Sequence, residues 1–262
     1  MTIIITGTSA GIGFTLAEYF GKKGHQVFGL SRKNVESKYF KTIATDITDN
    51  TQVQNAIAEV LKTESRIDVL INNAGMGMVG AVEDSTQEEI LKLFNLNLVG
   101  SVQMMTGVLP KMREQKMGQI INISSIGSEM GLPFRGFYSA SKSALDKVTE
   151  AIRYEVSPWN IQVCTLHLGD IKTNIAENRV KTKVSEPYQK TFNKVYSLMN
   201  AHVNDGTEPL EVAEYIDQLL AKKSWKAHFY FGKFGQKIGI PLKWILPQNF
   251  YENLMRKYNQ MD

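Results

Sequence analysis

Three side chains stand at a spacing that could act on a carbonyl group: Ser125, Tyr138 and Lys142. Tyr138 and Lys142 are four residues apart, so a helix would place them on one face, one turn from each other. Ser125 follows an apolar run that begins at Ile120 and predicts a buried strand. In open α/β sheets, ligands bind at the carboxyl ends of such strands. We therefore expect two hydroxyls and an ammonium to converge on a carbonyl oxygen, an arrangement suited to hydride transfer.

A glycine-rich turn connects the first predicted strand to the first predicted helix. Residues 6–13 form this turn, which contains Gly7, Ser9, Gly11, Ile12 and Gly13. Glycines let the backbone pass close to a pyrophosphate, and the free N–H groups at the start of the helix face that anion. The spacing Gly-x3-Gly-x-Gly differs from the common fingerprint Gly-x-Gly-x-x-Gly. Its place before the first helix nevertheless favours a bound dinucleotide over a simple tight turn.

The residues after the second predicted strand indicate which dinucleotide binds. An acidic residue there would accept hydrogen bonds from the adenosine ribose and repel a 2′-phosphate. The chain has Ser31, Arg32 and Lys33 instead, a hydroxyl beside two cations that suits a 2′-phosphate. We therefore favour NADP(H) over NAD(H). The alternative is that Arg32 and Lys33 are ordinary loop charges.

The predicted chemistry couples hydride transfer to proton transfer. A tyrosine hydroxyl has an ordinary pKa near ~10, which is too high for an efficient base at neutral pH. The Lys142 ammonium and the positive ring of an oxidised nicotinamide would lower the pKa of Tyr138. Ser125 would stabilise the substrate oxygen, and in the reducing direction Tyr138 would supply the proton. The Tyr-x-x-x-Lys spacing alone does not identify a catalytic pair, because Tyr19 and Lys23 have the same spacing where an ordinary surface pair is expected.

Short apolar runs alternate with longer amphipathic segments along most of the chain. Strands are expected at 2–6, 26–30, 42–45, 67–72, 119–124, 161–167 and 227–231, and helices near 12–23, 51–63, 87–115, 138–157 and 209–222. This alternation predicts an α/β fold with a parallel seven-stranded sheet and helices on both faces. At 262 residues, we expect one doubly wound Rossmann-type domain over residues 1–232.

Two segments interrupt this alternation. Residues 173–207 are polar, with a helix-like stretch near 188–203, and an insertion after a strand's carboxyl end favours a substrate lid over a surface insertion without a role. Residues 233–262 form a basic, amphipathic C-terminal tail, and 222–262 carry eight Lys/Arg against two acidic side chains. Aromatic residues among these charges could lie at an anionic membrane surface. We favour packing on the core or on a neighbouring subunit.

Composition narrows the class of protein. A hydrophobic content of 43% and a charged content of 21% are ordinary for a soluble globular protein. No apolar run approaches the ~20 residues of a membrane span. A strand that begins at Thr2 leaves no room for a signal peptide, and the single cysteine, Cys164, lies in a strand-like run. We expect a cytoplasmic protein with no nucleic-acid partner and no metal site, since the four histidines lack metal-ligand spacing.

With these motifs, residues 2–231 resemble the short-chain dehydrogenase/reductase family. The resemblance rests on the glycine turn, on Asp46 after the third strand, on 72–75 after the fourth, and on Asn97 together with Ser125, Tyr138 and Lys142. It implies a catalytic tetrad of Asn97, Ser125, Tyr138 and Lys142. It further implies cofactor contacts from Asp46, Ile47, Asn73, Ala74 and Gly75, and around the nicotinamide from Gly169, Ile171 and Thr173. One departure is Leu168, which stands where the family usually has proline.

The resemblance implies an NADP(H)-dependent oxidoreductase that acts on a carbonyl or secondary alcohol. Met76, Met78, Met130 and Phe134 flank the expected site and suggest an apolar small molecule as substrate. Asn97 is expected to hold a water next to Lys142. The alternative function is a dinucleotide-binding redox sensor or scaffold without turnover. Apolar stripes on the helices at 87–115 and 138–157 predict a homodimer or homotetramer.

Overall fold

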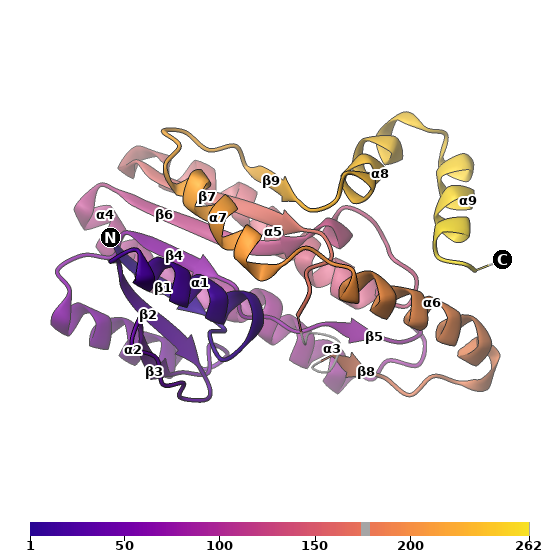
Figure 1. The fold of residues 1–262 in the computed structure, drawn as a ribbon, viewed down its shortest axis with the longest axis horizontal. Coiled ribbons are helices and arrows are strands. Elements are labelled where there is room, and N and C mark those ends of the chain that lie inside the picture. Colours follow the sequence, from indigo (N-terminus) through magenta and orange to yellow (C-terminus); the bar gives the residue numbers. More distant parts are fainter. Residues whose placement is uncertain (174–178, 262) are drawn as a thin grey trace.

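The computed structural model describes residues 1–173 and 179–261, built around one parallel sheet (Figure 1). Its strands are β1 (Thr2–Thr6), β2 (Gln26–Ser31), β3 (Lys41–Ala44), β4 (Val69–Asn72), β6 (Gly118–Ser125), β7 (Ile161–Leu168) and β9 (His228–Phe231). They form a seven-stranded sheet in the order β3-β2-β1-β4-β6-β7-β9. Every pairing between neighbours is parallel. The predicted seven-stranded parallel sheet is confirmed.

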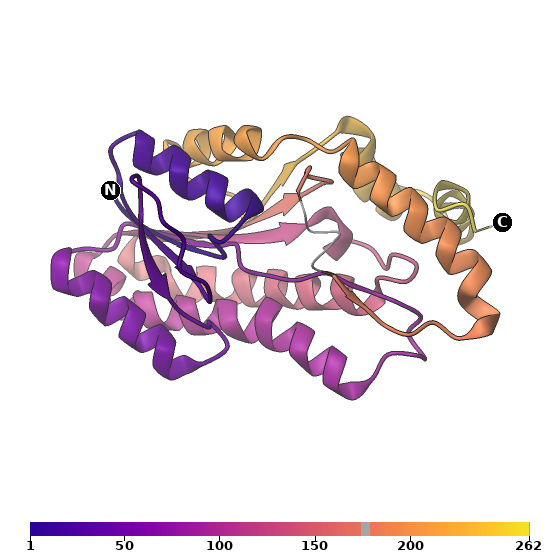
Figure 2. The ribbon, with the colours of Figure 1, turned by 60° about the horizontal axis from the view of Figure 1, so that its bottom comes forward.

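Helices cover both faces of the sheet, as Figure 2 shows. One face holds α1 (Gly11–Lys22) and α7 (Pro209–Leu220), and the other holds α2 (Asn50–Thr63), α4 (Ser101–Gln115) and α5 (Gly136–Val156). Successive side chains of a strand point to opposite faces. Ile3 and Ile5 therefore join the core under α1, whereas Ile4 joins the core under α2. Burial on both sides explains why the central strands are apolar on both faces over most of their length, as at Ile3, Ile4 and Ile5.

The strand order places a crevice at the carboxyl edge of the sheet. The chain builds outward from β1 through β2 to β3, then crosses to β4 and builds the other way through β6 and β7 to β9. The loops that leave β1 and β4 therefore turn away from each other, and ligands bind at such switch points. The glycine turn follows β1 and the segment 72–75 begins at the end of β4.

The predicted helix at 87–115 is continuous but changes its winding in the middle. It consists of α3 (Gln87–Phe94), a π-helical stretch η1 (Asn95–Gly100) and α4. Thr86 and Glu89 form a capping box at the start of α3. π-Helical turns are rare and occur frequently at functional sites. Asn97 lies within this turn and is fully buried.

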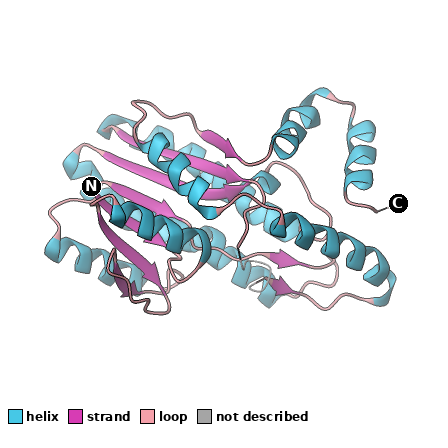
Figure 3. Cartoon of the chain, viewed as in Figure 1, coloured by secondary structure: helices cyan, strands magenta, loops and turns pink. Residues whose placement is uncertain are grey.

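The segment expected as a lid packs beside the main sheet. Within it, β8 (Val180–Lys181) pairs in parallel with β5 (Met78–Val79), and α6 (Glu186–Asn204) follows. Figure 3 shows this two-stranded sheet apart from the seven-stranded one. Phe192 and Met199 of α6 pack on Val79. The helix expected near 188–203 is therefore present, while residues 174–178 of the proposed lid lie outside the described residues.

The C-terminal tail folds into α8 (Phe234–Ile245) and α9 (Gln248–Tyr258). It touches the rest of the chain through a few polar contacts, including a hydrogen bond from the Tyr251 hydroxyl to Met130 Sδ at 3.3 Å. Large apolar side chains remain exposed on it, among them Phe234, Trp244, Ile245 and Phe250. In the described residues, no helix combines the length and hydropathy needed to cross the bilayer. Short 3₁₀ turns, η2 (Ile126–Ser128) and η3 (Ser157–Trp159), complete the fold.

The apolar stripes on α4 and α5 are largely covered by their own chain. Met105, Val108, Leu109, Leu145, Ile152 and Val156 are buried, and Val102 and Val148 pack against the same core. Exposed apolar surface persists at Val99, which is 40% exposed, and at Tyr154, which is 81% exposed. The exposed apolar surface on these helices, which was the basis for predicting a homo-oligomer, is thus smaller than the sequence suggests. The homo-oligomer remains a prediction.

Candidate active site

A cavity of about 430 Å³ lies at the carboxyl edge of the sheet. Residues predicted from the sequence line it: Gly7, Ser9, Gly11, Ile12, Ser31, Arg32, Asp46, Ile47, Asn73, Ala74, Gly75, Ser125, Tyr138, Lys142, Gly169, Ile171 and Thr173. Asn97 and Gly13 are absent from the lining and lie behind it. One cavity thus joins the glycine turn to the predicted catalytic residues.

The glycine turn has the backbone geometry that an anion site needs. Gly7 and Gly11 have φ angles of 76° and 57°, a region that side chains rarely adopt. A Cβ atom at Gly13 would lie 2.2 Å from the carbonyl oxygen of Gly7, so only glycine allows this close packing. The N-cap residue of α1 is Ala10, whose side chain has no acceptor for the first N–H groups of the helix. The first N–H groups of α1 are therefore left to donate hydrogen bonds to a ligand, as the pyrophosphate of a dinucleotide requires.

The end of β2 presents a cation to the same cavity. Arg32 is exposed and makes no ion pair or hydrogen bond through its guanidinium with any residue that the structure describes. The Ser31 hydroxyl donates to the Lys33 carbonyl at 2.6 Å, so it can offer a ligand only its lone pairs. Asp46 Oδ1 accepts hydrogen bonds from Thr48 N at 2.9 Å and Thr48 Oγ1 at 2.7 Å.

Tyr138 and Ser125 meet inside the cavity. Tyr138 is half-buried near the start of α5, and its side chain is hydrogen-bonded to that of Ser125 at the end of β6. Burial raises the pKa of Tyr138, while this hydrogen bond and the positive charges of Arg135 and Arg179 lower it. Ser125 Oγ also accepts from the backbone N–H of Gly127 at 3.0 Å, which fixes its position.

Lys142 is almost completely buried one helical turn beyond Tyr138. Its side chain is 5% exposed, and Nζ donates to the carbonyl of Ile123 at 2.9 Å. Burial lowers the pKa of Lys142 to about 8, and the negative charge of Asp146 opposes this shift. Lys142 therefore remains protonated at neutral pH, although burial disfavours its charged form.

Asn97 and Lys142 meet behind the cavity wall at Gly75. A Cβ atom at Gly75 would lie 3.1 Å from Asn97 Oδ1 and 3.3 Å from Lys142 Nζ. Asn97 Nδ2 donates to the Met76 carbonyl at 3.0 Å and to Ser141 Oγ at 3.1 Å, and Oδ1 accepts from Met76 N at 2.8 Å. Asn97 is thus held rigidly near Lys142, and its predicted role in holding a water remains a prediction.

The loop after β7 lacks the family's usual proline but is tied down by hydrogen bonds. Gly169 N donates to the Phe231 carbonyl at 2.8 Å, and Lys172 N donates to the Thr207 carbonyl at 2.9 Å. A Cβ atom at Gly11 would lie 3.4 Å from the Thr173 methyl group. The loop therefore closes over the glycine turn, where the resemblance places the nicotinamide contacts.

The substrate end of the cavity differs in part from the expected apolar lining. Met76 and Met78 line it, joined by Met199 and Val203 of α6. Met130 and Phe134 do not line it: Met130 contacts the tail, and the Phe134 ring packs against that of Phe192 at 5.4 Å.

Three charged residues of this lining were not identified from the sequence: Arg135, Asp170 and Arg179. Arg135 stands three residues before Tyr138, and that helical spacing was the available signal. The convergence of Asp170 and Arg179 on the same cavity depends on tertiary folding.

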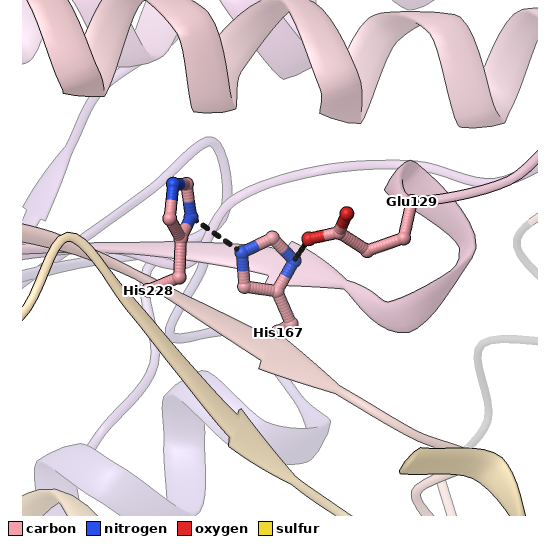
Figure 4. Close-up of side chains that lie close together, drawn as sticks. All are labelled: Glu129, His167 and His228. Carbon is pink, nitrogen blue, oxygen red and sulfur yellow. Dashed lines mark hydrogen bonds and ion pairs between the residues drawn. The ribbon is translucent and has the colours of Figure 1, made fainter. Parts of the chain in front are cut away.

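A pair of histidines, the buried His167 and the half-buried His228, lies beside Glu129 (Figure 4). The two ring nitrogens of His167 point in opposite directions: Nδ1 lies 3.0 Å from Ser128 Oγ, and Nε2 lies 3.0 Å from His228 Nδ1. His228 Nε2 in turn lies 3.0 Å from a carboxylate oxygen of Glu150. Since His167 turns one nitrogen to each neighbour, the geometry is that of a hydrogen-bonded chain rather than of ligands around one ion.

Comparison with known proteins agrees with this geometry. The family model for short chain dehydrogenases matches residues 1–184. A 3-ketodihydrosphingosine reductase of Bacteroides thetaiotaomicron is 37% identical over 258 residues, which cover 97% of this chain and 96% of the relative. An NADPH-dependent 3-dehydrocapnine reductase of Ornithobacterium rhinotracheale is 32% identical over 238 residues, which cover 86% and 82%. A short-chain dehydrogenase structure from Streptomyces avermitilis superposes with a TM-score of 0.83 at 26% identity, covering 98% of this chain and 97% of that one.

Proposed function

Because the chain belongs to the short-chain dehydrogenase/reductase family and is an oxidoreductase of that family, we propose that it reduces the carbonyl group of an apolar small molecule with NADPH. The observation that carries this proposal is the single cavity that joins the glycine turn to Ser125, Tyr138 and Lys142. A dinucleotide that enters at the turn has its other end directed toward these side chains. NADP(H), when bound, supplies or accepts the hydride.

Residues of the chain itself bind the substrate oxygen, transfer the proton and position these groups. Ser125, fixed by the N–H of Gly127, hydrogen-bonds the substrate oxygen and stabilises the charge that develops there. Tyr138 Oη gives the proton to that oxygen in reduction and takes it back in oxidation. Lys142 holds its ammonium near the tyrosine, so that the phenolate is tolerated. Asn97 holds the backbone at Met76 and thereby positions the wall against which Lys142 packs.

The preference for NADP(H) is supported by the charges at the end of β2. Arg32 carries a positive charge into the cavity lining with no internal partner among the described residues. Asp46, a carboxylate of the same lining, accepts hydrogen bonds from Thr48 through Oδ1. A 2′-phosphate would pair with the guanidinium. The relative from Ornithobacterium rhinotracheale is itself named as NADPH-dependent.

The substrate is proposed to be a 3-keto compound of the kind named for the relatives. Those names describe the reduction of 3-ketodihydrosphingosine and 3-dehydrocapnine. The wall made by Met76, Met78, Met199 and Val203 offers flexible apolar surface to such a molecule.

The experiment is NADPH consumption by the purified protein with 3-ketodihydrosphingosine, 3-dehydrocapnine and simple ketones. Tyr138→Phe keeps the ring but removes the proton donor, so kcat should fall by about 10²- to 10⁴-fold while NADPH affinity changes little. Tyr19→Phe is the matched control, because Tyr19 and Lys23 share the spacing but lie on α1, away from the cavity lining.

Two outcomes would contradict the proposal. A Tyr138→Phe protein that keeps more than about a tenth of the wild-type rate would remove the tyrosine from the chemistry. A wild-type protein that binds NADPH but oxidises it with none of the carbonyl compounds would favour a redox sensor or scaffold instead.

A further inference from the structure

Arg135 places a cation in the cavity without a hydrogen-bond or ion-pair partner among the described residues. It is the N-cap residue of α5, three residues before Tyr138, and it lines the cavity. Its Nε is buried and has no hydrogen-bond partner among the described residues. No carboxylate of residues 1–173 or 179–261 forms an ion pair with it.

Arg135 is half-buried, and its buried Nε has no partner among the described residues. A guanidinium that is partly removed from water is unfavourable unless it is paired. Burial lowers the pKa of Arg135, but a guanidinium stays protonated in proteins. Asp170 is the acidic side chain whose charge acts most strongly on it, yet the two form no ion pair. Asp170 Oδ2 instead accepts a hydrogen bond from Gln236 of α8. Charges removed from water are normally paired. The described residues give Arg135 no counterion, and an anionic group of a ligand in the cavity would provide one.

A second arginine converges on the same end of the cavity. Arg179 Nη1 donates to Asn200 Oδ1 of α6 at 2.9 Å, which orients the guanidinium. The side chain lies so close to Gly77 that a Cβ atom there would be 2.8 Å from Arg179 Cγ. Arg135, Arg179 and Tyr138 line the same cavity, and the positive charges of both arginines lower the pKa of Tyr138. They also repel each other, as the lowering of the Arg135 pKa by Arg179 indicates.

We propose that Arg135 and Arg179 bind an anionic group of the substrate, a carboxylate, sulfonate or phosphate, a few atoms from the carbonyl that Tyr138 protonates. Planar guanidinium groups bind such anions through paired hydrogen bonds. The methionine wall would hold the apolar remainder. The substrate class is therefore an amphiphile with a ketone and an anionic group, which narrows the 3-keto compounds proposed above to those that carry such a group. This assignment rests on the proposed function for the identity of the reacting group.

The opposing explanation is that the two arginines act only on the tyrosine. In that case they would lower the pKa of Tyr138 without contacting the substrate. Their loss would then shift the pH profile of the reaction but leave ligand selectivity unchanged. A binding measurement without turnover separates the two explanations.

The test is calorimetric titration of the protein, saturated with NADP⁺, with four ligands of equal chain length: octane-1-sulfonate, octanoate, octan-1-ol and octyltrimethylammonium. Both anions should bind about 10- to 100-fold more tightly than the alcohol, and the cation should bind most weakly. The two anions distinguish a sulfonate from a carboxylate preference. Arg135→Gln should bring the anion-to-alcohol affinity ratio close to one, and Arg179→Gln should lower it.

Matched variants distinguish an effect of the charge at Arg135 from an effect of the protein's net charge and from a failure to fold. Lys190→Gln removes one exposed cation of α6 outside the cavity and should leave the ratio unchanged. Arg135→Lys keeps the charge but loses the planar fork, so the ratio should be intermediate. The anion-to-alcohol affinity ratio compares two ligands on the same protein, so it does not depend on the active protein concentration. A variant that fails to fold is recognised because it no longer binds NADP⁺. If Arg135→Gln fails in this way, the affinity ratio of Arg135→Lys tests the anion site instead.

Equal binding of anion and alcohol by the wild-type protein would overturn the proposal, as would an unchanged ratio in Arg135→Gln. Failure of the proposed function appears differently: the anion preference persists, but no carbonyl compound is reduced. Conversely, a protein that reduces ketones yet binds octan-1-ol as tightly as octane-1-sulfonate keeps the function and loses the anion site.

Discussion

The buried ammonium of Lys142 should make the stability of the protein depend on pH in a predictable way. The ordinary pKa of 10.5 is lowered by burial to about 8. An unfolded chain keeps this proton up to about pH 10.5, whereas the folded chain releases it near pH 8. Between these values the unfolded state binds more protons, so the free energy of unfolding rises with pH. The penalty is complete below about pH 8 and is relieved as the pH rises toward 10.5.

The size of the effect follows from the same two values. At about 1.4 kcal/mol per pH unit, the lowered pKa corresponds to about 3 kcal/mol of destabilisation at neutral pH. Lys142→Met fills a similar volume and carries no charge. The stability of the wild type relative to Lys142→Met should therefore rise by roughly 2 to 3 kcal/mol between about pH 7 and pH 10. Loss of the hydrogen bond to the Ile123 carbonyl adds a constant offset of about 1–3 kcal/mol.

Urea denaturation of the cofactor-free protein at several pH values, followed by tryptophan fluorescence, measures this difference. Lys147→Met is the matched control on the same helix, because Lys147 is exposed and its pKa is raised by the hydrogen bond to Glu150. The stability that Lys147 contributes is fully present below its unfolded pKa, so this control should show no rise over the same range. A difference between the wild type and Lys142→Met that stays constant with pH would refute the argument.

Two further predictions concern cofactor choice and assembly. Arg32→Ala should weaken NADPH binding roughly tenfold, because one hydrogen bond to a charged group is lost at an exposed site, while NADH binding should barely change. Calorimetry measures both affinities. Equal losses for the two cofactors would show that Arg32 does not contact the 2′-phosphate. Sedimentation at micromolar concentration should find a homodimer or homotetramer, and Val99→Glu, which puts a charge on the exposed apolar surface of η1 just before α4, should shift it toward smaller species. A fully active wild-type species near the 29.5 kDa mass of one chain would contradict this prediction.

The local features of the site could be predicted from the sequence. Tyr138 and Lys142 share a face of α5 because their spacing is that of one helical turn. Gly7 and Gly11 have positive φ angles, which the glycine spacing after an apolar strand had indicated. Short, mainly apolar runs predicted the parallel strands, since burial on both faces favours apolar side chains at successive positions.

Other features depended on which distant segments meet. The strands β5 and β8 have two residues each, too few for a periodic pattern, and form because the chain brings them together. The sequence placed Asn97 in a helix, but its burial and its bonds to Met76 follow from the π-helical turn and from the loop after β4. Whether the stripe on α5 is covered by its own sheet or by a neighbour is likewise not a local property.

The sequence by itself thus determined the parallel sheet, the glycine-rich turn and the spacing of Tyr138 and Lys142, because each depends on residues close together in the chain. The tertiary structure decided which charges surround Tyr138. Arg135 and Arg179 lie 44 residues apart, and both line the cavity because β8, which directly follows Arg179, pairs with β5. His167 and His228 meet only because β7 and β9 are neighbours in the sheet. Electrostatics act through space, so the chemistry of the substrate end was fixed by folding rather than by spacing.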